Sequence, residues 1–137
     1  LLRIGRMTGE VAHEQKAAAM GRAFAPSARA RPSAHTMWLN AVDFAVGPTY
    51  EVVIVQGRET FAESSLVQAL WEAFVPNRVV LGRPAGEATP ASGLAPFVEK
   101  LEPLEGKATA YVCSNYSCRR PTTDPDRMLE LLREGYR

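Results

Sequence analysis

The chain has 137 residues, and its sixteen Lys and Arg against fifteen Asp and Glu leave a net charge of +1. This length is typical of one domain that buries about two thirds of its unfolded surface and needs no disulfides or metal sites to be stable. The basic residues are scattered, so their pattern predicts neither nucleic-acid binding nor attachment to an anionic membrane. The sequence has no apolar run of about 18 residues, so no membrane span is predicted.

Two observations bear on the provenance of the chain. Two cysteines are too few for a disulfide scaffold, which favours a reducing compartment and a cytoplasmic location. Residues Leu1 to Ile4 have the character of a helix whose beginning is missing. We therefore expect this chain to be a piece of a longer protein.

Residues 1–48 are expected to form a helical hairpin. The first helix covers residues 11–24, which are rich in Ala, Glu, Gln, Lys and Met, and Pro26 is expected to end it. A second helix is predicted from about Ser33 to Val46, with Gly47 and Pro48 as the stop. We expect the apolar stripes of both helices to face a core. The stripe residues are His13, Ala17, Met20 and Phe24 in the first helix, and Ala34, Met37, Trp38, Ala41, Val42 and Ala45 in the second.

Residues 49–137 are expected to form a small α/β element. The run from Tyr50 to Val55 is largely β-branched and nearly continuous in hydrophobicity, which is typical of a strand buried on both faces of a parallel sheet. A helix from Thr60 to Phe74 then leads to a second parallel strand over Arg78 to Leu81, as a right-handed βαβ unit. Residues 107–112 are a third strand candidate. The predicted fold class is therefore α/β, with a parallel βαβ-type sheet of three strands.

The remaining segments are predicted from local composition. Residues 83–92 are dominated by Pro, Ala, Gly and Thr and are expected to be irregular. A final helix is predicted through Leu132, with Asp124 as its N-cap, Pro125 at its first position and Gly135 beyond its end.

The two cysteines carry the most specific candidate chemistry. Four residues separate Cys113 from Cys118, which is not the spacing of a thioredoxin-type motif. We favour ordinary unpaired or structural cysteines; a reversible disulfide needs α-carbons within about 7 Å, and metal ligation needs further ligands that the neighbouring sequence lacks. We predict that the two cysteines flank a turn at the carboxyl edge of the sheet, with their α-carbons within about 7 Å. At least one sulfur should be partly exposed, with Arg119 or Arg120 close enough to favour a thiolate.

Other candidate positions have simpler interpretations beside the functional ones. His35 and Asp43 lie on the same side of the second helix and could line a pocket, although a solvated helix face explains them equally. Gly57 follows the first strand, where a backbone anion site can form, but one glycine indicates an ordinary turn. Trp38 and Trp71 are expected in the core. No cofactor and no metal is predicted.

Four blocks of sequence carry a resemblance to a known family. On them the chain resembles the C-terminal part of the spermatogenesis-associated, thioredoxin-domain-containing proteins, a family with a toroid like that of the six-hairpin glycosidases. The most specific block contains both cysteines. The blocks are Leu1 to Gly9, Gly47-Pro48 with Glu51 to Val55, Pro76 to Val80, and Ala110 to Cys118 with Pro121-Thr122.

The resemblance implies an architecture more firmly than an activity. Members carry an N-terminal thioredoxin-like domain, then the helical toroid, then a small α/β element. By this analogy residues 8–46 belong to the last hairpin of the toroid and residues from Tyr50 onward to the appended element. The thioredoxin motif and most of the sugar-site wall then lie outside this chain. The family usually has a tyrosine where this chain has His13.

Three functional hypotheses follow. The leading one is a non-catalytic, C-terminal structural or interaction segment, whose partner is the remainder of the full-length protein and which self-associates when isolated because its helices expose apolar faces. The second is a thiol–disulfide accessory that uses Cys113 and Cys118. The third is a share in a carbohydrate-binding cavity, for which no carboxylate pair can be assigned among Glu10, Glu14 and Asp43.

Overall fold

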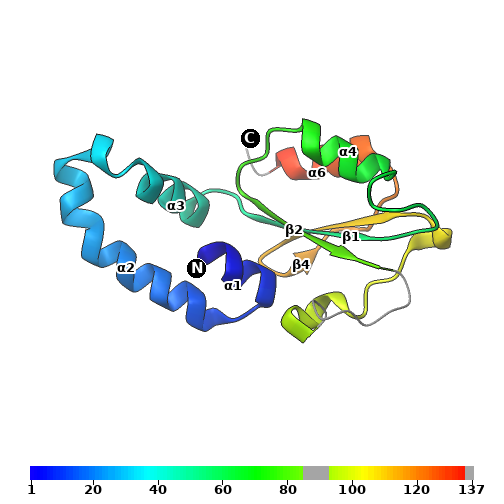
Figure 1. Cartoon of the computed structure of the whole chain (residues 1–137), viewed down its shortest axis with the longest axis horizontal. Helices are drawn as coiled ribbons and strands as arrows, with labels where there is room; N and C mark the ends of the chain where they lie inside the picture. Colours follow the sequence, from blue (N-terminus) through cyan, green and yellow to red (C-terminus); the bar gives the residue numbers. More distant parts are fainter. Residues whose placement is uncertain (85–92, 135–137) are drawn as a thin grey trace.

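The computed structural model describes residues 1–84 and 93–134. Most of the segment expected to be irregular, residues 85–92, and the expected helix stop at Gly135 lie outside the described residues. The described elements are α1 (Leu2–Thr8), α2 (Val11–Ala30), η1 (Pro32–Ala34), α3 (Thr36–Val46), β1 (Tyr50–Val55), α4 (Ser65–Glu72), β2 (Arg78–Arg83), η2 (Pro96–Val98), η3 (Leu104–Gly106), β3 (Thr109–Ser114), β4 (Ser117–Cys118) and α6 (Pro125–Arg133) (Figure 1).

Among the described residues the sheet has four strands in the order β2-β1-β3-β4. Strands β1 and β2 are parallel, with Tyr50 opposite Arg78, so the α/β class and the βαβ unit are confirmed. The third predicted strand joins the same sheet, but the sheet is mixed and not a three-stranded parallel one, because β3 runs antiparallel to β1 and β4 adds a fourth strand as a hairpin. The reason is the point of entry: β3 begins with Thr109 opposite Val55, at the end of β1, so it can only run back along it.

The core lies on both faces of β1, whose six residues are all buried as predicted. On one face Val52 and Ile54 belong to the cluster formed with α4 and α6, which lie side by side above the sheet (Figure 1). On the other face Val53 and Val55 pack with Val98 of η2. The apolar run of β1 therefore supports two layers.

Hydrogen bonds made by side chains near their first residues set where α6 and α4 begin. Helix α6 starts as predicted, with the Asp124 side chain accepting a 2.9 Å hydrogen bond from the Asp126 amide. Helix α4 is shorter than predicted and begins only at Ser65. The Glu63 carboxylate accepts hydrogen bonds from both the amide and the hydroxyl of Thr60, at 3.1 and 2.7 Å, and this closes a separate turn before the helix.

Gly57 has a packing role. A Cβ at this position would lie 2.3 Å from the Ala108 amide nitrogen and 2.5 Å from the Lys107 carbonyl carbon. Only glycine lets the chain leaving β1 pass this close to the chain entering β3. The simple-turn interpretation of Gly57 fits this packing, and no anion site is needed to explain the residue.

Helices α2 and α3 form an arm that extends away from the sheet (Figure 1). Helix α2 continues through Pro26 to Ala30, so the predicted stop is wrong; the proline removes one backbone donor, yet the Arg31 amide still bonds to the Ser27 carbonyl. The predicted core-facing stripes are also wrong, because Met20 and Phe24 are about half exposed, at 53% and 49%. Of the residues of α2, all of them described, only Ala28 is buried.

The arm is anchored beside the sheet at the end of α3, where α1 packs against it. In α3 the buried residue is Phe44, and the Arg3 guanidinium of α1 lies 4.6 Å from its ring centroid. Arg3 also donates hydrogen bonds to the carbonyls of Arg78, at 2.6 Å, and Pro76, at 2.9 Å. Met37, by contrast, is 80% exposed. The arm thus touches the sheet at its base, and its length has no partner among the described residues.

Candidate functional site: a disulfide hairpin beside a buried carboxylate

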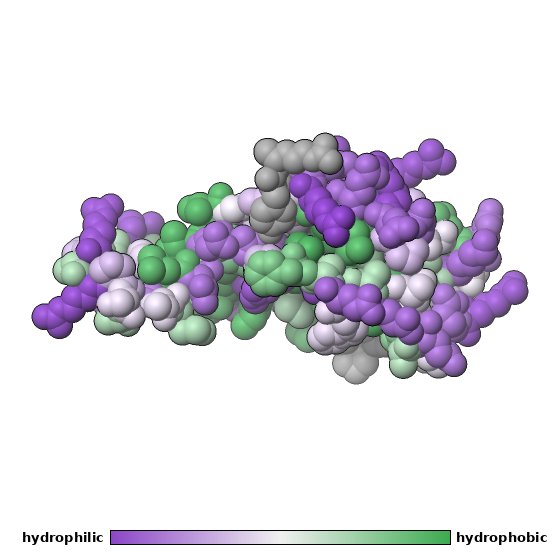
Figure 2. Space-filling view, turned by 90° about the horizontal axis from the view of Figure 1, so that it is seen from above, coloured by the Kyte–Doolittle hydropathy of each residue, from purple (hydrophilic) through white to green (hydrophobic). Residues whose placement is uncertain are grey.

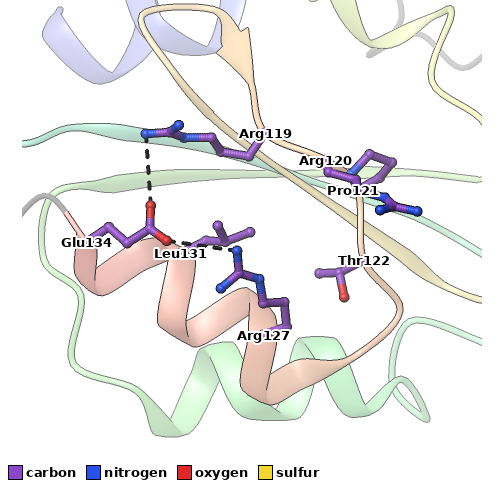
Figure 3. A pocket seen from close by; sticks show the side chains of 7 residues that line it. All are labelled: Arg119, Arg120, Pro121, Thr122, Arg127, Leu131 and Glu134. Carbon is purple, nitrogen blue, oxygen red and sulfur yellow. Dashed lines mark ion pairs between the residues drawn. The ribbon is translucent and has the colours of Figure 1, made fainter.

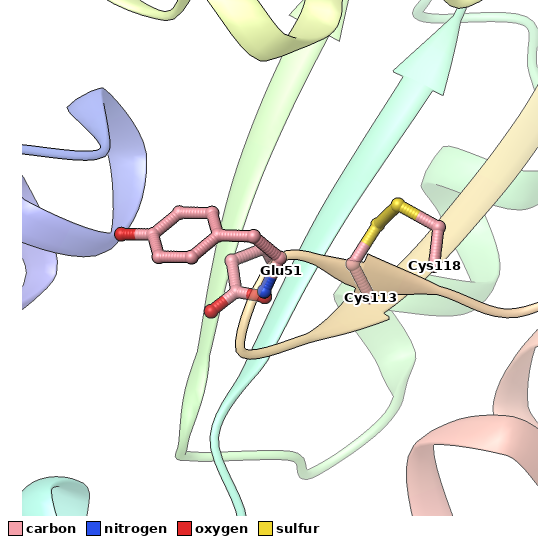
Figure 4. The surroundings of a disulfide bond; sticks show 4 residues. Glu51, Cys113 and Cys118 are labelled. Carbon is pink, nitrogen blue, oxygen red and sulfur yellow. A yellow bond between two sulfur atoms is a disulfide. The ribbon is translucent and has the colours of Figure 1, made fainter.

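Three chemically distinctive side chains form one row across the sheet. Glu51 of β1 lies opposite Cys113 of β3, and Cys113 lies opposite Cys118 of β4. Residues that face each other across a ladder project from the same side of the sheet, so all three share one face. Figure 4 shows Glu51 next to the disulfide in this row.

Cys113 and Cys118 are joined by a disulfide, with their α-carbons 3.8 Å apart. Of the favoured interpretations, that of free cysteines is therefore wrong, and the predicted approach of the two α-carbons to within about 7 Å is confirmed. The pair is a non-hydrogen-bonded one, because the Arg119 amide donates to the Val112 carbonyl on its flank. The two ends differ in access: Cys113 is 1% exposed, whereas Cys118 is exposed.

The predicted position of the pair at the carboxyl edge of the parallel strands is wrong. Because β3 runs antiparallel to β1, its end lies beside the start of β1, where Glu51 is the second residue. The hairpin therefore meets the amino ends of β1 and β2. It also lies close to α1, which follows the same edge.

The turn of the hairpin has an uncommon backbone. Asn115 and Tyr116 both have positive φ, at 50° and 61°, as a two-residue turn of type I′ requires. Asparagine tolerates this region, but tyrosine in place of the usual glycine costs about 1–2 kcal/mol. The disulfide and the contacts of Tyr116 hold the turn in this form.

Tyr116 makes contacts on three sides. Its amide donates a 3.2 Å hydrogen bond to Oε2 of Glu51, and its hydroxyl donates a 2.8 Å bond to the Gly5 carbonyl in α1. Its ring packs edge-on against Phe97 at 5.7 Å between centroids. Tyr116 thus ties the hairpin turn to the sheet, to α1 and to η2.

Glu51 is fully buried and shares one guanidinium with a second carboxylate. Nη1 of Arg6 lies 3.3 Å from Oε1 of Glu51 and donates a 2.8 Å bond to Oδ1 of Asn115, while Nε of Arg6 pairs with Glu14 at 3.1 Å. Burial raises the pKa of Glu51, and the hydrogen bond from Tyr116 and the charge of Arg6 oppose this only in part. Burial, followed by the charge of Glu14, raises the pKa of the Tyr116 phenol.

Sequence reasoning did not identify Glu51, Arg6 or Tyr116 as site residues. One signal was present: Glu51 is the only charged residue in the otherwise apolar run of β1. A carboxylate in a strand buried on both faces requires a buried partner. The identity of that partner could not be read from spacing, because Arg6 is 45 residues away.

His35 and Asp43 have separate partners in the structure. Nε2 of His35, at the start of α3, lies 3.0 Å from the Ser27 hydroxyl of α2. Oδ2 of Asp43 accepts a 2.9 Å hydrogen bond from the Asn77 amide group, just before β2. These contacts join α2 to α3 and α3 to the sheet, and neither residue lines the two cavities described below.

A basic recess lies on the opposite side of the hairpin, against α6. Its volume is about 470 Å³, and Arg119 and Arg127 both reach Glu134, at 3.9 and 4.0 Å (Figure 3). Arg127 is also paired with Glu130, which lies outside the lining, so only part of the positive charge of the recess is compensated. A smaller cavity of about 180 Å³ adjoins it and reaches Cys113. The residues lining the recess are Arg119, Arg120, Pro121, Thr122, Arg127, Leu131 and Glu134.

Neither a metal-binding cluster nor a membrane-spanning helix is found in residues 1–84 and 93–134. No group of three or more His, Cys, Asp or Glu in these ranges is arranged to hold a metal ion. No helix in the same part of the chain is long and apolar enough to cross a membrane.

Comparison with known proteins gives relatives of one name. The chain is 31% identical over 132 residues to spermatogenesis-associated protein 20 of Homo sapiens, and 26% identical over 134 residues to the proteins of that name from Rattus norvegicus and Mus musculus. These matches cover 96–98% of this chain but only 17% of each relative. No family model matches, and no solved structure matches.

Proposed function

We propose that this chain is a C-terminal structural and interaction segment of a larger protein, without catalysis of its own. The observation that carries the proposal is the exposed apolar length of the α2–α3 arm. Met20, Phe24, Met37 and Val46 are all exposed large hydrophobic residues of the arm. Apolar surface gathered in this way marks a contact with another body. Seen from above, green apolar surface gathers over α3 (Figure 2).

The occupant we propose is the remainder of the full-length protein. The chain corresponds to 17% of the length of its relatives, so most of a protein of that kind lies outside the described chain. A covalently attached neighbour needs no affinity of its own to stay in contact, because linkage keeps its effective concentration high. In our proposal that neighbour is a helical toroid like that of six-hairpin glycosidases, with α2 and α3 as its last hairpin.

A second exposed surface supports an interaction role. Trp71 of α4 and Phe74, just beyond that helix, are 82% and 92% exposed, so the expectation that Trp71 lies in the core is wrong. Helix α4 faces the sheet with Leu66 and Leu70 instead. Two large aromatic side chains this exposed and three residues apart in sequence could anchor a partner surface.

We also propose a cytoplasmic location, a thioredoxin-like domain elsewhere in the full-length protein, and partners that are neither nucleic acid nor membrane. These proposals draw on the resemblance described above and on the near-neutral charge of the chain. Sharing in a carbohydrate cavity receives no support from the structure, since His35 and Asp43 are bound to Ser27 and Asn77.

The proposal is tested in the full-length protein with Met37→Gln. An exposed methionine on a solvated helix tolerates this change within about 0.5 kcal/mol. A methionine covered by the toroid loses burial on the order of 1.5–3 kcal/mol. We expect the larger loss, together with faster amide exchange in α2 and α3.

The matched control is Asn40→Gln, which changes an exposed polar residue of the same helix. It should leave the free energy of unfolding unchanged. Equal, near-zero effects of the two substitutions in the full-length protein would show that the arm is solvated there, and would remove the proposal.

A further inference from the structure

The hydrogen bonds that hold α1 to the hairpin all start inside the ring closed by the disulfide. Asn115 accepts from Arg6, and Tyr116 donates to Gly5; both residues lie between Cys113 and Cys118. The same turn binds the buried Glu51 through the Tyr116 amide. The contact of α1 with the hairpin therefore depends on the shape of a short loop, whereas the bonds of Arg3 to the Arg78 and Pro76 carbonyls hold α1 to the sheet independently of it.

Within the hairpin itself, little besides the disulfide fixes that loop; its other ties are the contacts of Asn115 and Tyr116 with their neighbours. The β3–β4 ladder has only two residue pairs, Cys113 with Cys118 and Ser114 with Ser117. The turn between them requires positive φ at two residues that are not glycine. Opening the disulfide returns conformational freedom to a segment whose backbone is unfavourable by itself.

The two cysteine residues of the bond differ in exposure. Cys118 is exposed on the edge strand β4, whereas Cys113 is 1% exposed between β1 and β4. A thiolate attacks a disulfide along the S–S axis at a sulfur that it can reach. The geometry selects Cys118 as the attacked sulfur and Cys113 as the leaving group.

We propose that the Cys113–Cys118 bond is a thiol–disulfide exchange site that is attacked at Cys118 by a dithiol, and that its opening releases α1 from the hairpin turn. The first thiolate of the dithiol forms a mixed disulfide with Cys118, and the S–S bond breaks with its electron pair on the Cys113 sulfur, which takes a proton from water. The second thiol then attacks the mixed disulfide and frees Cys118. Two electrons and two protons pass to the cysteine pair, and the dithiol becomes a disulfide.

The release has a defined route. The turn binds Glu51, Gly5 and Arg6, and Arg6 in turn pairs with Glu14 of α2. Loss of the turn leaves Arg6 with the two carboxylates alone and leaves the Gly5 carbonyl without the Tyr116 hydroxyl. Reduction of the cysteine pair thus changes the contacts of Arg6, which pairs with Glu14 near the start of the helical arm.

The first test measures which cysteine reacts. In the full-length protein, Cys113→Ser leaves Cys118 as the remaining thiol of the pair, and Cys118→Ser leaves Cys113. Each variant is treated with oxidised glutathione, and glutathionylation of this hairpin is followed by peptide mass spectrometry. We expect Cys118 to react at least about tenfold faster than Cys113, because thiol reactivity follows access. Equal rates, or faster reaction at Cys113, would overturn the assignment.

The second test measures release and needs no cysteine variant. Amide exchange of α1 is compared in the oxidised protein and after treatment with dithiothreitol, at matched pH. We expect exchange of the Gly9 amide, which bonds to the Gly5 carbonyl, to rise about tenfold while β1 amides stay protected. Two results would contradict the proposal. In one, α1 amides exchange equally fast in the oxidised and the reduced protein. In the other, dithiothreitol reduces the disulfide only under conditions in which the β1 amides also exchange.

A third variant separates the effect of the Tyr116–Gly5 hydrogen bond from that of the disulfide. Tyr116→Phe keeps both cysteines but removes the hydroxyl that binds Gly5. In the oxidised state its α1 amides should exchange at a rate between those of the oxidised and reduced wild type. The Cys113→Ser/Cys118→Ser double variant is the control for dithiothreitol itself, and its α1 exchange must not respond to the reagent.

Discussion

The Tyr116 hydroxyl donates a 2.8 Å hydrogen bond to the Gly5 carbonyl, across 111 residues of sequence. This bond joins the tip of the β3–β4 hairpin to α1, and it is made by a turn residue that has a positive φ. Helix α1 and the α/β element are thus connected through a polar contact.

Tyr116→Phe tests the strength of this connection. Loss of one hydrogen bond should lower the free energy of unfolding by about 0.5–1.5 kcal/mol, since the ring contact with Phe97 is kept. Denaturant unfolding measures the loss, and hydrogen exchange should place it in α1. The matched control is Tyr111→Phe, which removes a 2.8 Å bond to the Glu102 carbonyl. If this control also exposes α1, the effect of Tyr116 is not specific to the hairpin.

Glu51→Gln tests the buried carboxylate. Because burial raises the pKa of Glu51, the folded state holds its proton more tightly than the unfolded state does. The contribution of Glu51 to stability is therefore fully present below the ordinary pKa of about 4.3 and declines as pH rises through the higher folded value. The glutamine variant lacks this decline, so its stability relative to wild type should increase between pH 4 and pH 7.

Glu63→Gln is the control with the opposite sign. Hydrogen bonds from the Thr60 hydroxyl and amide lower the pKa of the exposed Glu63 carboxyl. Its contribution is present above the ordinary pKa and is lost as pH falls, so this variant should be more harmful at pH 7 than at pH 4. Urea unfolding across this pH range measures both variants. Parallel curves for Glu51→Gln and wild type would show that Glu51 does not titrate with a raised pKa.

The sheet was predictable where local pattern and tertiary environment agree. The run of β1 is buried on both faces as its continuous hydrophobicity indicates, and Asp124 and Pro125 start α6 as capping chemistry requires. The direction of β3 was not predictable in this way. It depends on where the chain re-enters the sheet, and the strand itself carries no signal of direction.

The site was predictable only in part, for a physical reason. The spacing of Cys113 and Cys118 permits a disulfide, but their pairing requires a two-residue turn with positive φ, and the sequence Asn115-Tyr116 lacks the glycine that signals one. The apolar stripe that contains Phe24 was wrongly expected to face a core, because its helical periodicity was the only signal available. Periodicity shows that a face is apolar, but it does not show what covers that face.

Trp71→Gln with Phe74→Gln tests the outer surface of α4. Both side chains are exposed, so the double variant of the isolated chain should keep its free energy of unfolding to within about 1 kcal/mol. Its self-association, measured by sedimentation velocity, should decrease because the anchor is removed. Leu70→Ala on the buried face is the control and should cost about 2–5 kcal/mol. Unchanged self-association would show that this surface does not hold copies together.

Gly57→Ala and Gly21→Ala form a pair with opposite expected signs. At Gly57 the new methyl group meets the backbone of Lys107 and Ala108, which cannot rotate away, so β3 must shift at a cost of about 1–3 kcal/mol. At Gly21, within α2, a Cβ meets nothing within 4 Å in the described structure, and alanine should stabilise the helix by about 1 kcal/mol. Thermal unfolding of the isolated chain measures both. Repeating Gly21→Ala in the full-length protein extends the test, because the toroid proposed to cover the arm would bring new atoms against α2. A gain in the isolated chain that becomes a loss in the full-length protein would place a close neighbour at this glycine, whereas the same gain in both would leave this part of α2 in solvent.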